Sequence, residues 1–157
     1  MKRTSSSPTQ SREPSVTLRF VATNAPAIAG ERELRFRVLR EPLGHGRDAV
    51  AFPFDDESVH LLAFDGEEVV GCVLFHPESA TAGRLYQMAV TPSLQGCGVG
   101  RVLVRTLEDK LRKDGVRRIH LHARAHAAGF YGRLGYVVEG EPFEEVGVPH
   151  HMMARDL

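Results

Sequence analysis

Residues Thr91-Pro-Ser-Leu-Gln-Gly-Cys-Gly-Val-Gly100 form a glycine-rich segment between two patterned stretches. The residues before it, Leu85-Tyr-Gln-Met-Ala-Val90, belong to a strand predicted over 84–90. The residues after it place apolar side chains, Val102 among them, at i, i+3 and i+4 and leave Glu108 outside that stripe, which predicts an amphipathic helix over about 98–114. The first turn of a helix has unpaired N–H groups at the positive end of its dipole, and glycines let a phosphate approach the backbone. The segment therefore predicts a phosphate-binding loop.

The spacing of the glycines separates the cofactor classes that use such loops. The P-loop pattern is absent. A dinucleotide fingerprint fails in both registers, because its last position falls on Arg101 or on Leu103 instead of a small residue. Gly96-Cys-Gly-Val-Gly100 is similar to the S-adenosylmethionine loop of methyltransferases, although that loop usually follows an early strand of a longer, mostly parallel domain. A methyltransferase therefore stays open as an alternative.

The pattern Gln95-x-x-Gly98-x-Gly100 fits a third class better. Together with the preceding strand and with Phe130-Tyr-Gly-Arg-Leu-Gly-Tyr136, it resembles the GNAT superfamily, the Gcn5-related N-acetyltransferases. The resemblance covers about residues 18–157. Within the superfamily, Leu121-His-Ala-Arg, the stretch 143–150 and Met153 resemble a subgroup of small bacterial enzymes without a settled substrate.

The resemblance implies an α/β (α+β) fold, with a mixed, mostly antiparallel sheet flanked by helices on both faces. The sheet would splay between strands 84–90 and 118–123 and open a slot for the pantetheine arm of acetyl-CoA, the implied cosubstrate. The backbone of the strand would pair with the pantetheine, and the N–H groups of the loop would hold the pyrophosphate. The implied cofactor-binding residues are Met88, Ala89, Val90, Gln95, Gly96, Cys97, Gly98, Val99, Gly100 and Arg101.

The resemblance also implies catalytic roles. Tyr131 matches the family tyrosine that protonates the leaving thiolate, and a phenol with a pKa of about 10 is a competent donor at neutral pH. The alternative to a catalytic role is that Tyr131 is only an aromatic side chain packed in the core. The base that deprotonates the amine is sought among Glu144, Glu145, His120, His122 and His150 or in a water chain, with Glu145 and His150 put forward. For His150 the alternative is a histidine at a strand start that bonds only to backbone.

The predicted reaction is direct attack of a primary amine on the thioester of acetyl-CoA in a ternary complex. An acyl-enzyme is not expected, because no Ser or Cys lies in a strand–elbow–helix setting with a paired histidine. A backbone N–H at the end of strand 84–90 would hold the oxyanion. A catalytically silent acyl-CoA-binding protein of the same fold is the second hypothesis, and the intact Tyr131 favours the enzyme over it.

The rest of the chain predicts a flexible polar tail over 1–14 and one domain over 15–157. The segment 41–57 has no clear periodicity and is expected, with the last strands, to form the substrate wall. The further helices are expected over 24–40 and 127–134, and the further strands over 16–21, 58–64, 69–76, 136–140 and 148–154.

Composition limits the remaining functions. Twenty basic residues balance twenty acidic ones, which disfavours nucleic acid and anionic membranes as partners. Two cysteines and the absence of an apolar leader favour a reducing cytoplasm. No metal is expected, since His120 and His122 lack a third ligand at a recognised spacing.

Two further points stay open in the sequence. The arginines at 35, 37 and 40 on the first helix either meet an anionic substrate or form a solvated helix face. Cys97 at a helix start is either a thiol with a lowered pKa or the variable position of the loop. Dimers are common in the superfamily, so a homodimer is an expectation of the resemblance alone.

Overall fold

The computed structural model describes residues 15–157, so the predicted tail over 1–14 lies outside the described residues. Its strands join one sheet in the order β1-β2-β3-β4-β5-β8-β6, and β7 pairs with β8 beside that path. The strands are β1 (Thr17–Val21), β2 (Val59–Asp65), β3 (Glu68–Pro77), β4 (Ala82–Val90), β5 (Arg118–Arg124), β6 (Val137–Val138), β7 (Phe143–Glu145) and β8 (Val148–Asp156).

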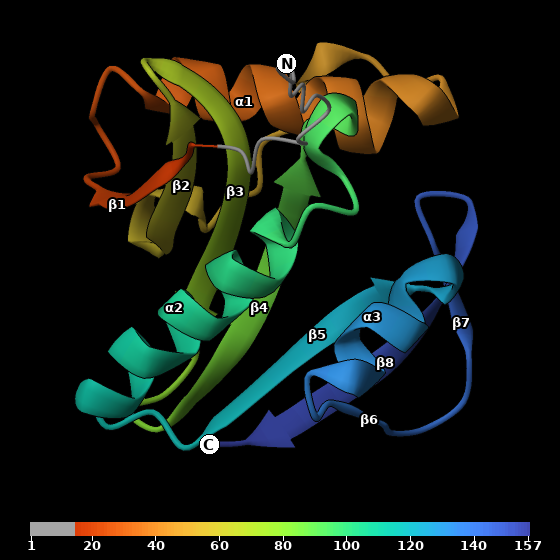
Figure 1. Cartoon of the computed structure of the whole chain (residues 1–157). Helices are drawn as coiled ribbons and strands as arrows, with labels where there is room; N and C mark the ends of the chain where they lie inside the picture. The colour runs from red at the N-terminus through yellow and green to blue at the C-terminus, as the bar shows by residue number, and fades with distance from the viewer. Residues whose placement is uncertain (1–14) are drawn as a thin grey trace, which may run out of the picture.

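Strands β4 and β5 form the parallel pair of this sheet, and the other paired neighbours are antiparallel. The parallel ladder covers only Ala82–Leu85 against Arg118–Leu121. Beyond it the two strands diverge, as Figure 1 shows. The register against β3 shifts between Cys72 and Leu74, and Gln87 on β4 has a φ of 55°, which marks a bulge that bends β4 at this point. The predicted mixed sheet and its splay are therefore confirmed.

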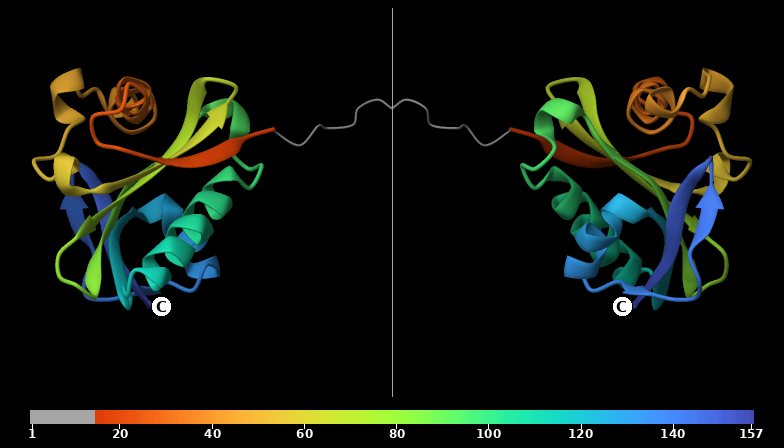
Figure 2. Two further views of the ribbon diagram at one scale, coloured as in Figure 1. Left: turned by 90° about the vertical axis from the view of Figure 1, so that its left-hand side faces the viewer. Right: turned by 90° about the vertical axis from the view of Figure 1, so that its right-hand side faces the viewer.

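Helices cover both faces of the sheet, as predicted. They are α1 (Ile28–Arg35), the π-helical turn η1 (Phe36–Arg40), α2 (Val99–Lys113) and α3 (Ala128–Arg133), with short 3₁₀ turns at η2 (Glu41–Leu43), η3 (Arg47–Ala49), η4 (Asp55–Glu57), η5 (Pro92–Leu94) and η6 (Ala125–Ala127). Figure 2 shows α1 on one side of the sheet and α2 with α3 on the other.

Each helical layer packs on its own apolar cluster. The larger cluster lies between the sheet and helices α2 and α3, and includes Leu103, Leu107 and Leu121. The smaller one lies under α1 and includes Leu34 and Leu74. Every residue of β3 from 69 to 75 is buried, as its continuous apolar run predicts for a strand covered on both faces.

Several element boundaries differ from the prediction. The helix expected over 24–40 begins only at Ile28 and turns π-helical at Phe36. The strand expected over 136–140 is only two residues long, Val137 and Val138, which are exposed and pair with Ala154 and Met153 of β8. The segment 41–57 contains three short 3₁₀ turns. Strand β7 was not predicted, because its three residues carry no alternation.

Helix α2 also departs from its predicted pattern at two positions. Val102, expected in the apolar stripe, is 48% exposed. Glu108, expected outside the stripe, is fully buried, where it accepts hydrogen bonds from Tyr136 at 2.8 Å and from Arg155 at 2.7 Å. Partners from β8 and the α3–β6 connection thus neutralise a carboxylate that the helix alone would place in solvent.

Candidate active site

The divergence of β4 and β5 opens a cavity of about 690 Å³. Its walls come from η1, β4, the glycine loop, the start of α2, β5, α3 and the β7–β8 hairpin. Beyond Leu85 the strand β4 has no ladder with β5, so within residues 15–157 the edge of β4 that faces β5 has no strand partner over Tyr86–Val90. A strand edge of this kind can pair with an extended ligand arm.

The cavity brings together most of the predicted cofactor-binding residues. Those that line it are Met88, Ala89, Val90, Gln95, Gly96, Gly98, Gly100 and Arg101. Cys97 is exposed outside the cavity wall, and Val99 packs into the core beneath α2. Their side chains therefore do not face the cavity, and only their backbone groups could serve a ligand there.

The loop geometry requires its glycines. Gly96 and Gly98 have φ values of 81° and 90°, in the left-handed region that other residues avoid. Gly98 is the N-cap of α2 and supplies no side chain to its first turn. A Cβ on Gly100 would lie 3.2 Å from the Met88 Cε, inside the cavity wall. The amide of Gln95 ties the loop to β4 by donating to the Val90 carbonyl at 2.9 Å.

Tyr131 lies on α3 and lines the same cavity. Its ring packs edge-on against Phe130 and Tyr136, as the alternative of a packed aromatic expects, and the residue also lines the cavity. Its hydroxyl makes no side-chain hydrogen bond within residues 15–157, whereas the Tyr136 hydroxyl is bound to Glu108. Burial raises the pKa of Tyr131 well above its ordinary value, so the phenol keeps its proton at neutral pH.

Glu145 and two histidines meet at the end of the cavity formed by β5, β7 and β8. The His122 Nδ1 donates to Glu145 Oε1 at 2.7 Å, and the His150 Nε2 lies 3.9 Å from Glu145 Oε2. His150 is 3% exposed, and its Nδ1 donates to the Val148 carbonyl at 2.9 Å. The backbone-bonded alternative for His150 is thus observed together with its position in the cavity wall.

The charge state of this cluster follows from its surroundings. Burial lowers the pKa of His122, and the hydrogen bond to Glu145 does not fully offset that effect. Burial alone would raise the pKa of Glu145, but the hydrogen bond from His122 and the nearby Arg84 guanidinium hold it below its ordinary value. At neutral pH the pair is therefore a carboxylate and a neutral imidazole, with the Nε2 of His122 left as a lone-pair acceptor.

The other candidate bases lie outside the cavity wall. His120 bonds to Glu78 at 2.6 Å, and Glu144 is exposed on β7. Among residues 15–157, no group of three or more His, Cys, Asp or Glu side chains is arranged to hold a metal ion. Cys72 is buried beside the bulge, and burial raises the pKa of its thiol far above the usual range, which makes it a poor nucleophile.

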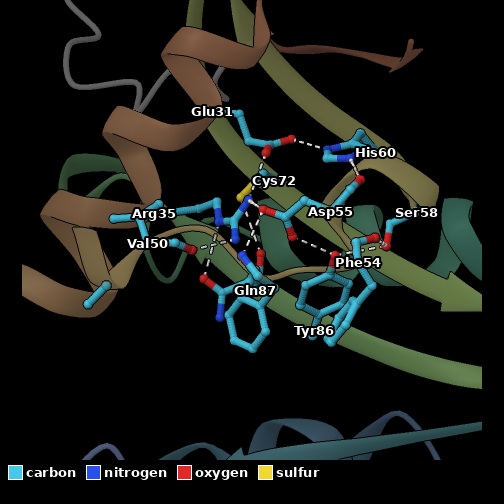
Figure 3. Close-up of polar contacts among 12 residues, drawn as sticks. Glu31, Arg35, Val50, Phe54, Asp55, Ser58, His60, Cys72, Tyr86 and Gln87 are labelled. Atoms are coloured by element: carbon cyan, nitrogen blue, oxygen red, sulfur yellow. Dashed lines mark hydrogen bonds and ion pairs between the residues drawn. The ribbon is translucent and has the colours of Figure 1, made fainter. Parts of the chain in front are cut away.

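A buried ionic network supports the cavity from the α1 side, as Figure 3 shows. Arg35 is fully buried, and its guanidinium contacts Glu31 at 3.0 Å, Asp55 at 3.1 Å and the Gln87 side-chain oxygen at 3.2 Å. Burial alone would lower the pKa of Arg35, but Asp55 and Glu31 hold it above its ordinary value, so the guanidinium stays charged. The expectation that Arg35 lies on a solvated face or meets substrate is therefore wrong.

The network continues to the floor of the cavity. Tyr86 donates to Asp55 Oδ1 at 2.7 Å, and His60 bridges Glu31 at 2.5 Å and the Asp55 carbonyl at 2.8 Å. Tyr86 and Gln87 both line the cavity. Sequence reasoning missed this network, and the only local signal for it was the i, i+4 pair of Glu31 and Arg35.

Comparison with known proteins places this site in a family. Residues 45–157 match the family model described as an acetyltransferase (GNAT) domain. The chain is 30% identical over 127 residues to the uncharacterized N-acetyltransferase YitI of Bacillus subtilis, an alignment that covers 77% of this chain and 85% of YitI. The splayed sheet and its cavity define an acetyltransferase of the GNAT type, and the chain belongs to the GNAT acetyltransferase family.

Solved structures share the fold at lower identity. A putative N-acetyltransferase from Lactobacillus plantarum superposes with a TM-score of 0.81 at 23% identity, covering 90% of this chain and 98% of that one. A GNAT family acetyltransferase from Elizabethkingia anophelis with acetyl-CoA bound gives 0.68 at 16% identity, covering 90% and 98%. The family uses acetyl-CoA as its acetyl donor. Within residues 15–157, none of the helices combines the length and apolar character needed to cross a bilayer.

Proposed function

We propose that the chain transfers the acetyl group of acetyl-CoA to a primary amine by direct attack in a ternary complex. The observation that carries the proposal is the cavity itself, which joins the free edge of β4, the glycine loop and the Tyr131 hydroxyl. The acetyl-CoA bound by the Elizabethkingia anophelis protein supports the same ligand for this chain. The pantetheine would pair with β4, and the pyrophosphate would meet the N–H groups of the loop and of the first turn of α2.

The proposed chemistry assigns one proton transfer to each end of the cavity. The lone pair of the His122 Nε2 accepts the amine proton, while Glu145 orients the imidazole and His150 completes the cluster. The amine then attacks the thioester carbonyl, and the C–S bond of the tetrahedral intermediate breaks. Tyr131 donates its hydroxyl proton to the departing thiolate, and the second proton lost by the attacking nitrogen restores the phenol. The low nucleophilicity of the buried Cys72 supports direct transfer without an acyl-enzyme.

The test is release of free thiol from acetyl-CoA by the purified full chain in the presence of a panel of amines. The panel holds amino acids, polyamines, amino sugars, aminoglycosides and short peptides. Amine-dependent release, with the acetylated amine found by mass spectrometry, is the expected result. Binding of acetyl-CoA without release across the panel would instead support the silent acyl-CoA-binding protein, and tight binding of S-adenosylmethionine with none of acetyl-CoA would support the methyltransferase.

The pH dependence of the reaction is expected to report His122. Because the pKa of His122 is lowered from 6.5, its base form persists through neutral pH and is lost only on acidification below that value. The acidic limb of kcat/KM should therefore have a midpoint below 6.5, and the limb should disappear in His122→Asn. Circular dichroism at each pH separates this effect from unfolding. A limb that persists unchanged in the variant would remove His122 from the base role.

A further inference from the structure

The charges in the cavity wall are strongly unbalanced. Among the described residues that line it, Glu145 is the only carboxylate. The cationic side chains that line it are Arg40, Arg84, Arg101, Arg105, Arg124 and Arg133. This imbalance is local, because the whole chain carries equal numbers of acidic and basic residues.

The six arginines fall into two groups on opposite faces of the sheet. Arg101 and Arg105 lie on α2 and Arg133 on α3, next to the glycine loop. The other three, Arg40, Arg84 and Arg124, lie on η1, β4 and β5. The first group shares the helices that border the proposed phosphate site, although the Arg105 guanidinium is already bound to Glu108 and to the Leu134 carbonyl. The second group has no role in the proposed binding of that cosubstrate.

Strand alternation fixes the second group on the α1 face. Leu121 and Ala123 of β5 point into the core beneath α2 and α3, so Arg124 points to the opposite face. There its Nη2 donates to the Leu39 carbonyl of η1 at 2.6 Å. Arg84 and Tyr86 share this face of β4, since Leu85 between them packs into the α2 cluster. Glu145, His122 and the second group thus surround the same end of the cavity.

These three guanidinium groups are only partly satisfied by the protein. Arg40 donates its Nε to the Ala49 carbonyl at 2.9 Å and its Nη1 to the Leu39 carbonyl at 3.2 Å. Its Nη2 has no hydrogen-bond partner among residues 15–157. The nearest carboxylate to Arg84 is Glu145, 3.7 Å from its Nη2, and the Arg84 Nε is buried without a partner among the described residues. The group therefore retains N–H donors for a ligand.

The electrostatics favour an anion at this end. Burial lowers the pKa of all three arginines, and the Arg124 guanidinium lowers that of Arg40 further. Desolvated positive charges of this kind are costly unless an opposite charge compensates them. Glu145, with Glu78 near Arg84, supplies fewer negative charges than the three guanidinium groups carry. A bound oxyanion would accept hydrogen bonds from their free N–H groups, in the planar, bidentate geometry that guanidinium favours.

We propose that the acceptor is a small primary amine that also carries an oxyanion, a carboxylate or a phosphate, held by Arg40, Arg84 and Arg124. The inference rests on the proposed acetyl transfer and names its substrate class. The amine lies toward Glu145 and His122, and the oxyanion lies toward η1. Polyamines and aminoglycosides, which bring only positive charge, are poor ligands for this end of the cavity.

The test compares matched amines with the full chain and acetyl-CoA. One arm pairs α-amino acids with their amides, and the other pairs O-phosphoethanolamine with ethanolamine. Within each pair, kcat/KM is expected to be about 10- to 100-fold higher for the anionic member, as for gain of a charge-assisted hydrogen bond. The arm with the larger ratio of kcat/KM, anionic over neutral member, shows whether the site prefers a carboxylate or a phosphate. Equal or better use of the neutral members would overturn the inference while leaving acetyl transfer established.

Variants test the residues. Arg40→Gln and Arg124→Gln are expected to raise KM for the anionic amine about 10- to 100-fold with a smaller change in kcat and no change in KM for acetyl-CoA. Arg37→Gln is the matched control, because Arg37 lies in the same turn but is exposed outside the cavity wall. Equal KM values in Arg37→Gln and the two test variants would contradict the assignment.

A direct binding measurement separates this inference from the proposed reaction. The chain loaded with coenzyme A is titrated with each matched pair by calorimetry, which does not require turnover. Tighter binding of the anionic members, weakened in Arg124→Gln, would support the anion site even if no thiol is released. Equal binding within every pair would refute the anion site whether or not the chain is active.

Discussion

Replacement of Tyr131 by Phe is expected to lower kcat by about 100- to 10,000-fold, the usual contribution of a positioned general acid. The change removes one hydroxyl and keeps the ring that packs against Phe130 and Tyr136. Because that hydroxyl has no hydrogen-bond partner among residues 15–157, its loss leaves no protein group unpaired. Stability and the affinity for acetyl-CoA should therefore stay unchanged. Thiol release at saturating amine measures kcat, and calorimetry measures the affinity for acetyl-CoA.

Tyr136→Phe is the matched control for this prediction. Tyr136 is a buried tyrosine of the same core, but its hydroxyl binds Glu108 and does not line the cavity. We expect this variant to lose stability and to keep its kcat per folded molecule. A kcat for Tyr131→Phe within a factor of about three of the parent would exclude the phenol as the acid, since a general acid contributes about 100-fold or more.

Replacement of Arg35 by Met is expected to lower the free energy of unfolding by about 3–5 kcal/mol, the cost of breaking a buried ion pair by removing one partner. The methionine fills much of the same volume, so the main loss is electrostatic. Glu31 and Asp55 would be left in the core without the cation that compensates them. The Gln87 side chain would also lose its donor at the bulge of β4. Urea unfolding followed by circular dichroism measures the change.

Arg37→Met is the matched control for the buried network. Arg37 lies two residues further along the same helical segment, and its side chain is 40% exposed and 3.8 Å from Glu33. Solvent screens this pair, so the substitution should leave the free energy of unfolding almost unchanged. A similar loss of stability in the two variants would mean that helix propensity, and not the buried pairing, accounts for the effect. A folded Arg35→Met that binds acetyl-CoA normally would show that Gln87 holds its conformation unaided.

The sequence contained the local signals for much of this protein. The continuous apolar run of β3, the apolar stripe of α2 and the glycines at 96, 98 and 100 act through neighbours close in the chain, so their patterns and φ preferences are readable without a structure. These features predicted the individual elements and the loop, and the resemblance to the GNAT superfamily implied the mixed sheet and its splay. The same resemblance implied Tyr131 as the proton donor, and the structure shows that this residue lines the cavity.

The charged interior was decided only by tertiary structure. Arg35 reads as a surface residue of an amphipathic helix, and Glu108 as a polar position of α2, until η4, β4 and β8 bring partners from far along the chain. The cluster of Glu145, His122 and His150 and the arginines of η1, β4 and β5 likewise meet through strand pairing across long sequence separations. Whether a charge is buried depends on which opposite charges and donors surround it in space, and no local pattern of residues carries that information.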